Sequence, residues 1–462
     1  MSVLWYSRCE KGLRKEAWTL AIETLSWMQM RRLSESLAFE KTVKQLNIRD
    51  PNALRLARLL IYETSKRQNF IDRFINNALK TRRLEEYDLG VQAFMRLYVY
   101  QTRISNNWSK TDFREAESIA SLGRSILGWQ TLHKIEDILG LLLTQKQTTV
   151  LERVDDEERV ALETFQPTWF VKYCFRVFGR PQGIAILQGD SKPPITYVRL
   201  NTLKEEGNNI LSKLEQEGIK VEKEQELKYA YRIKSTRLPL ATTESFLNGL
   251  FYIQDKASCF AAEAADPKPE MIIIDVCAAP GAKTTYLAQL MHNQGRIYSL
   301  DYSERRMTTW KKEVSRMNVT IAVPIIADVR KQFPITTEAD VIVLDPPCTS
   351  TGTFRKLPSS RWRLTPRSIQ TMATTQWQMI HNCAKHVKVG GSLIYSTCSI
   401  TIEENEIIIE RFLKHHPEFS LTSIAPKIGL LGLRGLADCQ RLYPHIHECN
   451  GFFIAKLKKM GN

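Results

Sequence analysis

The chain has 462 residues, of which 43% are apolar and 25% charged, an ordinary composition for a globular protein and enough length for about two or three domains. Lys and Arg number 65 against 50 Asp and Glu, a formal net charge of +15, so a polyanion is the expected partner, with nucleic acid ahead of an anionic membrane. No apolar run is long enough to span a membrane, and charged residues occupy the start where a signal peptide needs an apolar stretch. The nine cysteines are odd in number and form no Cys-x-x-Cys pair, which argues against a disulfide framework and favours a cytoplasmic protein.

The first 150 residues have the pattern of an all-helical domain. Apolar residues recur at three- and four-residue spacing, glycine is nearly absent before Gly90, and Pro51 is the only proline. In residues 53–80 this spacing predicts a buried apolar stripe and a basic face. The basic face either binds RNA or is simply a solvated surface, and the sequence leaves both interpretations open. The stripe would contain Leu56, Leu59, Leu60, Phe70, Ile71, Phe74 and Ile75, and the basic face Arg55, Arg58, Lys66, Arg67 and Arg73.

Residues 151–250 combine a linker with a small mixed subdomain. The acidic segment 151–165 predicts a connecting helix, and an aromatic-rich helix follows it and ends at Gly179. Alternating patterns at YVRLN, YRIKS and GLFYIQD, with a helical pattern at NILSKLEQEGI, predict an α+β unit. We expect its VRLNTLK segment to contact RNA through Arg199, Asn201 and Lys204.

From residue 251 to residue 462, strands alternate with helices. This alternation predicts an α/β domain with a doubly wound, mainly parallel sheet, whose ligands bind at the carboxyl ends of the strands near the topological switch point. The predicted strands are 271–275, 295–301, 322–328, 339–345, 391–398 and 451–458. The sequence therefore predicts three domains, 1–150, 151–250 and 251–462.

Acidic residues end three successive predicted strands, at Asp275, Asp301 and Asp328. Asp301 is placed to accept the ribose hydroxyls of a nucleoside, and Asp328 to accept from an adenine amino group. The loop CAAPGAK after the first strand lacks both G-x-G-x-x-G and the ending of a phosphate loop, which favours a cofactor with adenosine but no phosphate. S-adenosylmethionine fits that description, and the alternative is a structural turn with acids at helix N-termini.

Cys348 and Cys398 each follow a predicted strand, and the first belongs to the sequence DPPC. Two thiols beside an acid suit methylation of cytosine at C5, a carbon that is a poor nucleophile until a thiolate adds at C6. Asp345, hydrogen-bonded to the base, would favour that addition, and a second group must help the adduct collapse. The segment PHIHEC has residue types that bind metals, but no second cluster completes a site, so we expect no metal.

The chain resembles the RsmB/Sun family of S-adenosylmethionine-dependent RNA cytosine-5 methyltransferases. The resemblance lies in DVCAAPGAKT, DYSERRM, DPPCTSTGTF, YSTCSITIEENE and GFFIA, and before them in QPTW, VRLNTLK and QDKAS. The helical part resembles the NusB-like RNA-binding domain of RsmB-type members. The resemblance implies a Rossmann-like class I methyltransferase domain preceded by a small α+β subdomain and the helical domain, acting as a monomer on ribosomal or transfer RNA, without a membrane or a metal.

The same resemblance assigns roles to individual residues. It implies that Cys398 attacks C6, that Cys348 assists release of the adduct, and that Asp345 contacts the base and the cofactor. The implied cofactor residues are Cys277, Ala278, Ala279, Pro280, Gly281, Ala282, Lys283, Asp301, Arg306, Asp328 and Asp345. Ala282 departs from the family's usual Gly-Gly-Lys, and its methyl group is tolerated only if the backbone there has a negative φ.

Three classes of function stay open from the sequence. An RNA methyltransferase is favoured, with ribosomal RNA ahead of transfer RNA by resemblance. A non-catalytic RNA-binding scaffold would need neither the two thiols nor Asp345. A small-molecule or protein methyltransferase would need neither the net charge of +15 nor the helical domain.

Overall fold

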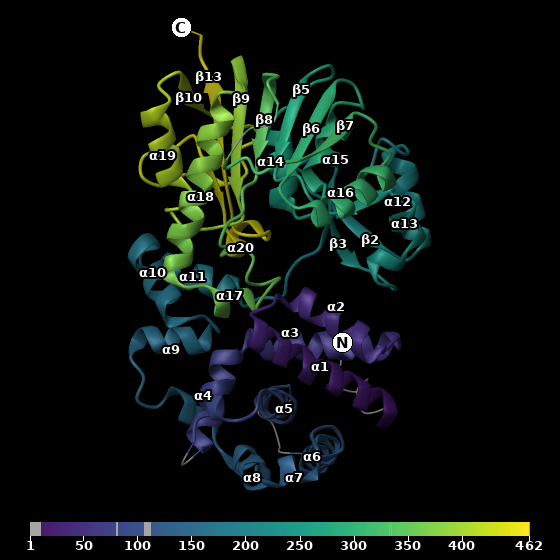
Figure 1. Ribbon diagram of the computed structural model, residues 1–462, viewed down its shortest axis with the longest axis vertical. Helices are drawn as coiled ribbons and strands as arrows, with labels where there is room; N and C mark the ends of the chain where they lie inside the picture. Colours follow the sequence, from purple (N-terminus) through teal and green to yellow (C-terminus); the bar gives the residue numbers. More distant parts are fainter. Residues whose placement is uncertain (1–10, 80–81, 106–111, 332, 334, 462) are drawn as a thin grey trace. The chain divides into compact units, whose positions relative to one another are not determined.

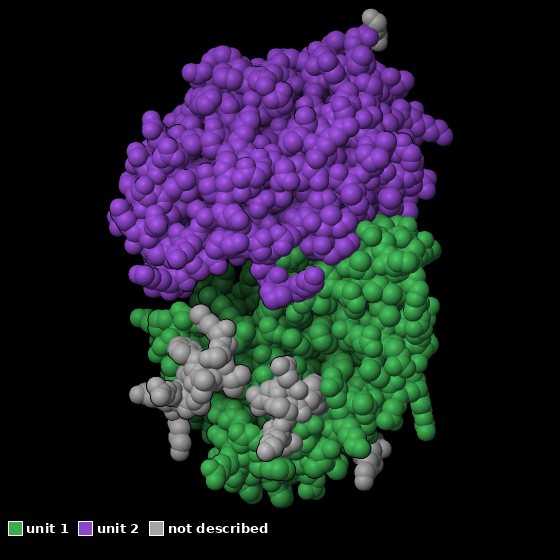
Figure 2. Space-filling model, turned by 180° about the vertical axis from the view of Figure 1, so that it is seen from behind, with its two compact units in different colours: residues 1–191, 354–364 green, residues 192–353, 365–462 purple. Residues whose placement is uncertain are grey.

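The computed structural model describes the whole chain except residues 1–10, 80–81, 106–111, 332, 334 and 462. Two compact units divide it, distinguished by colour in Figure 2. Unit 1 contains residues 1–191 and 354–364, and unit 2 contains residues 192–353 and 365–462. The predicted division into three domains at residues 150 and 250 stays a prediction. The two units are defined by how residues pack together, which does not test domains assigned from sequence patterns.

Unit 1 is helical, as the apolar spacing predicts. Asp50 caps α3 by accepting from the N–H groups of residues 52 and 53. Pro51 occupies the first helical turn, where an N–H group would have no partner within the helix, so proline loses no hydrogen bond there. One apolar core joins the helices from Ala17 to Leu162. The helices are α1 (Lys11–Arg31), α2 (Glu35–Leu46), α3 (Pro51–Lys66), α4 (Gln68–Ala78), α5 (Leu89–Val99), α6 (Phe113–Leu127), α7 (Trp129–His133), α8 (Glu136–Thr144), α9 (Asp156–Glu163), α10 (Thr168–Phe178), α11 (Arg180–Gly189) and α17 (Ser360–Arg363).

The predicted apolar stripe of α3 and α4 is buried, apart from Leu59, which is half-buried. Part of the predicted basic face is also buried. Lys66 is 6% exposed and donates to the carbonyl of Ser191 at 2.6 Å, and burial lowers its pKa to about 8. Arg73 donates to the Val150 carbonyl at 2.8 Å and pairs with Glu158. These two side chains therefore stabilise unit 1, and the basic face is narrower than the sequence predicts.

Residues 354–364, from the C-terminal half of the sequence, pack among the helices of unit 1. The Arg361 guanidinium is fully buried and donates to the carbonyls of Phe165 at 2.6 Å and Phe354 at 2.8 Å. The indole of Trp362 donates to the Ser65 carbonyl at 2.6 Å, and Tyr62 donates to the Arg355 carbonyl at 2.6 Å. The segment that follows the DPPCTSTGT loop thus belongs structurally to the helical unit.

Unit 2 begins with a small antiparallel sheet in the order β2-β3-β1-β4, the predicted α+β unit. Its strands are β1 (Tyr197–Leu200), β2 (Lys220–Lys223), β3 (Ala230–Ser235) and β4 (Phe251–Ile253), and its helices are α12 (Gly207–Gln216) and α13 (Glu244–Leu247). Apolar residues of β1, β4 and α12 form one small core, which includes Val198, Ile210 and Phe251.

The large sheet of unit 2 has nine strands in the order β11-β12-β13-β9-β8-β5-β6-β7, with β10 paired to β13 (Figure 1). The strands from β9 to β7 are parallel, and β13 joins β9 in the antiparallel sense. They are β5 (Ile272–Val276), β6 (Arg296–Asp301), β7 (Ala322–Ile326), β8 (Ala339–Leu344), β9 (Val387–Thr397), β10 (Phe419–Thr422), β11 (Leu430–Leu431), β12 (Gln440–Leu442) and β13 (Phe452–Lys459). The chain order reverses between β5 and β8, which is the predicted switch point.

Helices cover both faces of this sheet, because the parallel strands are apolar on both sides. One core contains side chains of α14 (Lys256–Ala264), α15 (Ala282–Leu290) and α16 (Glu304–Arg316). The other contains side chains of α18 (Pro366–Ala384) and α19 (Glu406–His415). The doubly wound α/β prediction is confirmed. Within the described parts of the chain, no helix combines the length and apolarity needed to cross a membrane.

Candidate active site

The two cysteines singled out by the sequence lie together at the ends of adjacent parallel strands. Cys348 lies in the loop after β8, and Cys398 directly follows β9. Their Sγ atoms are 3.2 Å apart. The Ser350 hydroxyl lies 3.4 Å from the sulfur of Cys398 and 3.8 Å from that of Cys348. Both sulfurs can therefore reach a single small substrate group.

The surroundings of the two thiols give them different acidities. The pKa of Cys398 is lowered from its ordinary value, first because Cys348 hydrogen-bonds to its sulfur and further because of the Ser350 hydroxyl and the charge of Lys283. The same hydrogen bond and burial raise the pKa of Cys348 well above its ordinary value. Since the thiolate is the nucleophilic form of cysteine, these contacts favour Cys398 for attack and leave Cys348 with a proton.

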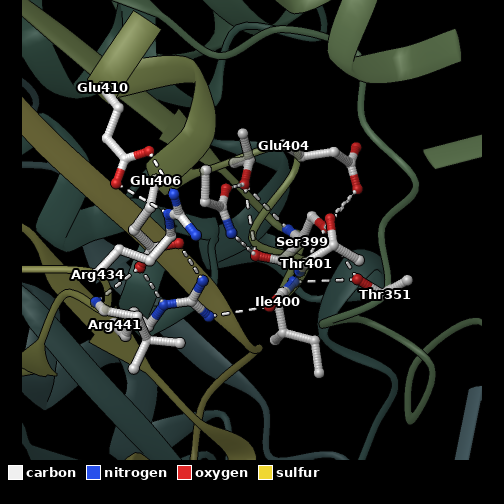
Figure 3. A network of polar contacts seen from close by, with 12 residues as sticks. Thr351, Ser399, Ile400, Thr401, Glu404, Glu406, Glu410, Arg434 and Arg441 are labelled. Atoms are coloured by element: carbon white, nitrogen blue, oxygen red, sulfur yellow. Dashed lines mark hydrogen bonds and ion pairs between the residues drawn. The ribbon is translucent and has the colours of Figure 1, made fainter. Parts of the chain in front are cut away.

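A buried carboxylate, that of Glu404, connects the two cysteine loops. Figure 3 shows it beside Ser399 and Thr401. Its Oε1 accepts from the backbone N–H of Thr349 at 2.8 Å and from the Gln376 amide at 2.9 Å. Its Oε2 accepts from the hydroxyls of Thr349, Ser399 and Thr401 at 2.5, 2.6 and 2.7 Å. These donors replace the water that a buried carboxylate loses. Because Thr349 and Ser399 each follow one of the cysteines directly, one side chain positions both thiols.

Two further contacts fix the backbone next to the thiols. The N–H of Gly352 donates to the carbonyl of Cys398 at 2.9 Å, and the N–H of Gly451 donates to the carbonyl of Gly352 at 2.8 Å. A Cβ at Gly352 would lie 2.0 Å from the Gly451 carbonyl oxygen, so this approach requires glycine. The buried ion pair of Arg441 with Glu406 lies beside the loop that follows Cys398. Arg441 donates to the Ile400 carbonyl of that loop at 2.9 Å (Figure 3).

The loop after β5 brings a positive charge to this site. Lys283 is buried and forms an ion pair with Asp345. Burial opposes the charge of Lys283, but Asp345 outweighs it and raises the lysine pKa. Gly281 has a φ of 112°, whereas Ala282 begins α15 and does not have a positive φ. The extra methyl group of Ala282 therefore causes no backbone strain, the condition under which this departure from Gly-Gly-Lys is expected to be tolerated.

One of the three acids expected around the cofactor has a different position. Asp275 is 1% exposed and accepts from the Thr284 hydroxyl at 2.5 Å, and burial raises its pKa to about 7. Trp310 donates to the same Thr284 hydroxyl at 3.0 Å. Asp275 therefore attaches α15 and α16 to the sheet and is not part of the cavity that the other two acids line.

That cavity, of about 200 Å³, opens beside the ends of β5, β6 and β7. Cys277, Asp301, Tyr302 and Asp328 line it. The Asp301 carboxylate accepts from two backbone N–H groups, at 3.0 and 3.3 Å, and pairs with Arg306 at 3.0 Å. Carboxylates that can accept from hydroxyl and amino groups, in a loop without phosphate-binding glycines, suit a nucleoside that carries no phosphate.

Two arginines hold the acids that line this cavity. Arg306 also donates to the Ala279 carbonyl, so it holds the loop as well as the acid. Arg330 binds both oxygens of Asp328, at 2.8 and 2.7 Å, and lowers the pKa of that carboxyl. In the same loop Ala278 is buried and Pro280 is exposed.

Two of the three predicted RNA contacts are wrong. Arg199 is fully buried, donates to Gln289 and Thr285 at 2.9 Å each, and joins β1 to α15. Asn201 is 1% exposed and donates to two backbone carbonyls at 2.8 and 3.0 Å. Side chains without contact with solvent cannot reach an RNA backbone. Lys204 is exposed, and its contact with RNA stays a prediction.

Sequence reasoning missed the positioning role of Glu404 and the pairing of Lys283 with Asp345. A hydroxyl residue directly follows each cysteine, Thr349 and Ser399, and this repetition was the available signal. By itself it does not identify Glu404 as the residue that both hydroxyls contact. The histidines of PHIHEC lie on α20 (Pro444–His447). Among the described residues, no three His, Cys, Asp or Glu side chains form a group that could hold a metal ion.

Comparison with known proteins agrees with this geometry. Residues 262–458 match a family model described as 16S rRNA methyltransferase RsmB/F, and residues 166–238 match the ferredoxin-like domain of RsmF/B-like methyltransferases. The chain is 28% identical to a probable ribosomal RNA small subunit methyltransferase B of Bacillus subtilis, over 96% of this chain and 98% of the relative.

Two further similarities differ in how much of the chain they cover. A tRNA (cytosine(72)-C(5))-methyltransferase of Pyrococcus horikoshii is 38% identical, over 48% of this chain and 56% of the relative. The crystal structure of PH0851 matches 96% of this chain and 99% of its own, with a TM-score of 0.81 and 29% identity. The fold similarity therefore extends over the helical part as well as the catalytic part.

Proposed function

We propose, since this chain belongs to the RsmB/F family of methyltransferases, that it methylates C5 of a cytosine in RNA with S-adenosylmethionine as the methyl donor. The observation that carries the proposal is the pair of thiols, Cys348 and Cys398, with sulfurs 3.2 Å apart beside Asp345 at the switch point of the sheet. A scaffold has no need for a thiol whose neighbours lower its pKa.

The residues of this site suit the steps that C5 methylation requires. Cys398, as the thiolate, adds to C6 of the cytosine and makes C5 nucleophilic. The ion pair of Lys283 with Asp345 lies close to the thiols and stabilises the electron density that the addition places on the base. After methyl transfer, the C5 proton passes to solvent water, the electrons of the C5–H bond re-form the C5–C6 double bond, and the C6–S bond breaks with its electron pair on the Cys398 sulfur. Cys348 carries a proton at Sγ next to the departing sulfur and assists that departure.

The cofactor would occupy the cavity at the ends of β5, β6 and β7. Asp301 would accept from the ribose, Asp328 would lie beside the adenine, and Cys277, the first residue of the loop that ends at Lys283, would form part of the wall. When bound, S-adenosylmethionine supplies an electrophilic methyl group on a sulfonium centre. The protein supplies orientation, because cavity and thiols lie at the same edge of one sheet.

Ribosomal RNA is the substrate class that the similarities favour. The relative that covers nearly the whole chain, helical part included, is named for ribosomal RNA. The relative named for transfer RNA covers only 48% of the chain. We therefore expect the helical unit to contribute to the choice between the two substrates.

The test is methyl transfer with the purified chain. Ribosomal and transfer RNA from cells that lack this protein would each be incubated with protein and S-adenosylmethionine, digested to nucleosides and analysed by mass spectrometry. We expect 5-methylcytidine in ribosomal RNA, and bisulfite sequencing would locate it. 5-methylcytidine in transfer RNA alone would contradict the substrate class, and methylation of another atom or of no RNA would contradict the reaction.

A further inference from the structure

The cysteines of the chain differ in how well a small reagent can reach them. Of the nine, the structure describes eight, and five of these are buried: Cys174, Cys259, Cys383, Cys439 and Cys449. The other three are half-buried: Cys277, Cys348 and Cys398. Among the described cysteines, these three are therefore the ones that a small solute can reach without opening of the fold.

Cys348 and Cys398 are also close enough to react with each other. Their Sγ atoms lie 3.2 Å apart, and a disulfide bond needs about 2.0 Å, so the sulfurs must approach by about 1.2 Å. Their loops leave neighbouring parallel strands, β8 and β9. Strands in a sheet lie about 4.8 Å apart, within the about 4.4–6.8 Å between Cα atoms that a disulfide spans. Rotation of the two side chains can therefore form the bond while the strands stay in place.

Polar contacts beyond the strand ends hold the two loops together. The Gly352 N–H, in the loop of Cys348, donates to the Cys398 carbonyl at 2.9 Å. Glu404 accepts from Thr349 and from Ser399, the residues that directly follow the two cysteines. The surroundings thus keep the two thiols next to each other.

The two thiols differ in acidity as a reactive cysteine differs from a resolving one. The hydrogen bond from Cys348 is the largest of the effects that lower the pKa of Cys398, and it outweighs burial. Burial raises the pKa of Cys277 well above its ordinary value, so that thiol keeps its proton. Susceptibility to oxidation follows thiolate character and access. Cys398 is therefore oxidised first, and Cys348 lies beside it as the thiol that reacts next.

We propose that Cys348 and Cys398 are also an oxidation site, at which a hydroperoxide joins them in a reversible disulfide and thereby stops methyl transfer. The disulfide needs neither RNA nor cofactor, so only its effect on methyl transfer rests on the proposed function. It also protects the nucleophile. A sulfenic acid that has become a disulfide is not oxidised further to the sulfinic acid, which thiol reductants do not reverse.

With hydrogen peroxide the oxidation balances in two steps. The Cys398 thiolate attacks one peroxide oxygen, an S–O bond forms, and the O–O bond breaks with its electron pair on the departing hydroxide. That hydroxide takes the proton of Cys348 and becomes water. The Cys348 sulfur then attacks the Cys398 sulfur, an S–S bond forms, and the S–O bond breaks with its electron pair on a second hydroxide, which a solvent proton converts to water. The two sulfurs together lose two electrons, and the peroxide gains them.

The test uses the full chain, reduced, freed of reductant and treated with a small molar excess of hydrogen peroxide. The remaining thiols are blocked in denaturant with N-ethylmaleimide, and tryptic peptides are analysed by mass spectrometry without reduction. We expect the peptides of Cys348 and Cys398 to be joined, with the buried cysteines still free. Methyl transfer should fall about tenfold or more and return in dithiothreitol. Equal oxidation of the buried cysteines, or activity lost without this disulfide, would overturn the proposal.

Cys348→Ala tests the resolving thiol through the chemical state of Cys398, whatever the activity of the variant. Under peroxide its Cys398 should become the sulfinic or sulfonic acid and stay so in dithiothreitol, because no second thiol consumes the sulfenic acid. In the wild type, Cys398 should return to the thiol. Equal return of the Cys398 thiol in both proteins would show that Cys348 does not resolve the oxidised sulfur, and the proposal would fail.

Cys277→Ala is the matched control, since it removes the third half-buried thiol among the described cysteines. The disulfide of Cys348 with Cys398 should form in it to within about twofold of the wild-type extent. A disulfide that includes Cys277 would contradict the pairing. Because the peptides are read without any methyl transfer, a missing disulfide leaves the proposed reaction untouched. A disulfide in a chain that methylates no RNA would contradict that reaction and keep the oxidation site.

Discussion

Two regions at the strand ends of the large sheet are stabilised in different ways. The first, the thiol centre, contains Cys348 and Cys398, and the second, the proposed cofactor edge, contains Asp301 and Asp328. Around the thiols, a fully buried carboxylate, Glu404, collects neutral donors from both cysteine loops. At the cofactor edge, the acids Asp301 and Asp328 are paired with arginines whose side chains are 41% and 45% exposed. The Glu404 network is closed to water, whereas the two arginines at the cofactor edge are in contact with it.

This difference has a physical consequence for function. Breaking a buried hydrogen bond leaves an unsatisfied group, whereas an exposed arginine can leave its partner and be replaced by water or by a ligand hydroxyl at little cost. The thiol centre is thus built for fixed geometry, and the cofactor edge for exchange of occupants. Changes at the first should therefore affect rate and stability, and changes at the second should affect affinity.

The largest effect should come from Cys398→Ala. Without the attacking sulfur, methylation should fall to background and no covalent protein–RNA complex should form. Denaturing gel electrophoresis with labelled RNA and a radiolabelled methyl assay measure both. Cys383→Ala, at a buried core cysteine, is the matched control and should retain activity. A methylating Cys398→Ala variant would contradict the assignment of the nucleophile.

Cys348→Ala should separate the two thiols. Attack and methyl transfer remain possible, but the adduct cannot leave normally, so a slowly migrating covalent complex should accumulate on a denaturing gel. Loss of the proton donor to the Cys398 sulfur should also make Cys398 less acidic. A complex trapped in Cys398→Ala and absent from Cys348→Ala would reverse the two roles.

Glu404→Gln tests the closed network. The glutamine amide replaces one accepting oxygen of the carboxylate by an NH₂ group, which cannot accept from the hydroxyls around it. The free energy of unfolding should therefore fall by about 1–3 kcal/mol. The turnover rate should fall as the cysteine loops move, with little change in cofactor affinity. Glu410→Gln, which removes a partly exposed ion pair with Arg434, should change stability by less than about 1 kcal/mol. Similar losses in both variants would refute the contrast between the two regions.

Asp301→Ala tests the exchangeable edge. Calorimetry with S-adenosylhomocysteine should show affinity reduced by about tenfold or more, because hydrogen bonds to a charged acceptor are lost. At saturating cofactor, the turnover rate should stay close to that of the wild type. Unchanged affinity would mean that the ribose is not bound at Asp301, and a loss of rate alone would place Asp301 in the thiol centre.

The smallest effect should be a shift in the pH dependence of the rate. The thiolate is the active form, so the rate rises as pH passes through the pKa of Cys398, which is lowered by its neighbours. Ser350→Ala removes one of those neighbours and should move the rising limb to higher pH by less than about one unit. A shift to lower pH would show that the Ser350 hydroxyl destabilises the thiolate.

The sequence by itself determined the helical and α/β character of the two main parts and the pairing of two cysteines. Helical spacing predicted the helices of residues 1–150 in the described part, because burial of one helix face leaves a local pattern. Alternation of strands and helices predicted the parallel sheet, and a parallel sheet brings successive strand ends to one edge. Cys348 and Cys398 could therefore be paired from the sequence, fifty residues apart (398 − 348 = 50).

Only the tertiary structure decided which polar residues are buried and what they hold. Arg199 and Asn201 were predicted to contact RNA, yet their hydrogen-bond partners include Gln289 on α15 and Met317 just after α16, up to 116 positions away. Residues 354–364 carry no local sign of packing with the helical unit, and Glu404 resembles any acid in a charged turn. Burial of a polar group depends on partners that folding supplies from distant parts of the chain, and no local pattern records them.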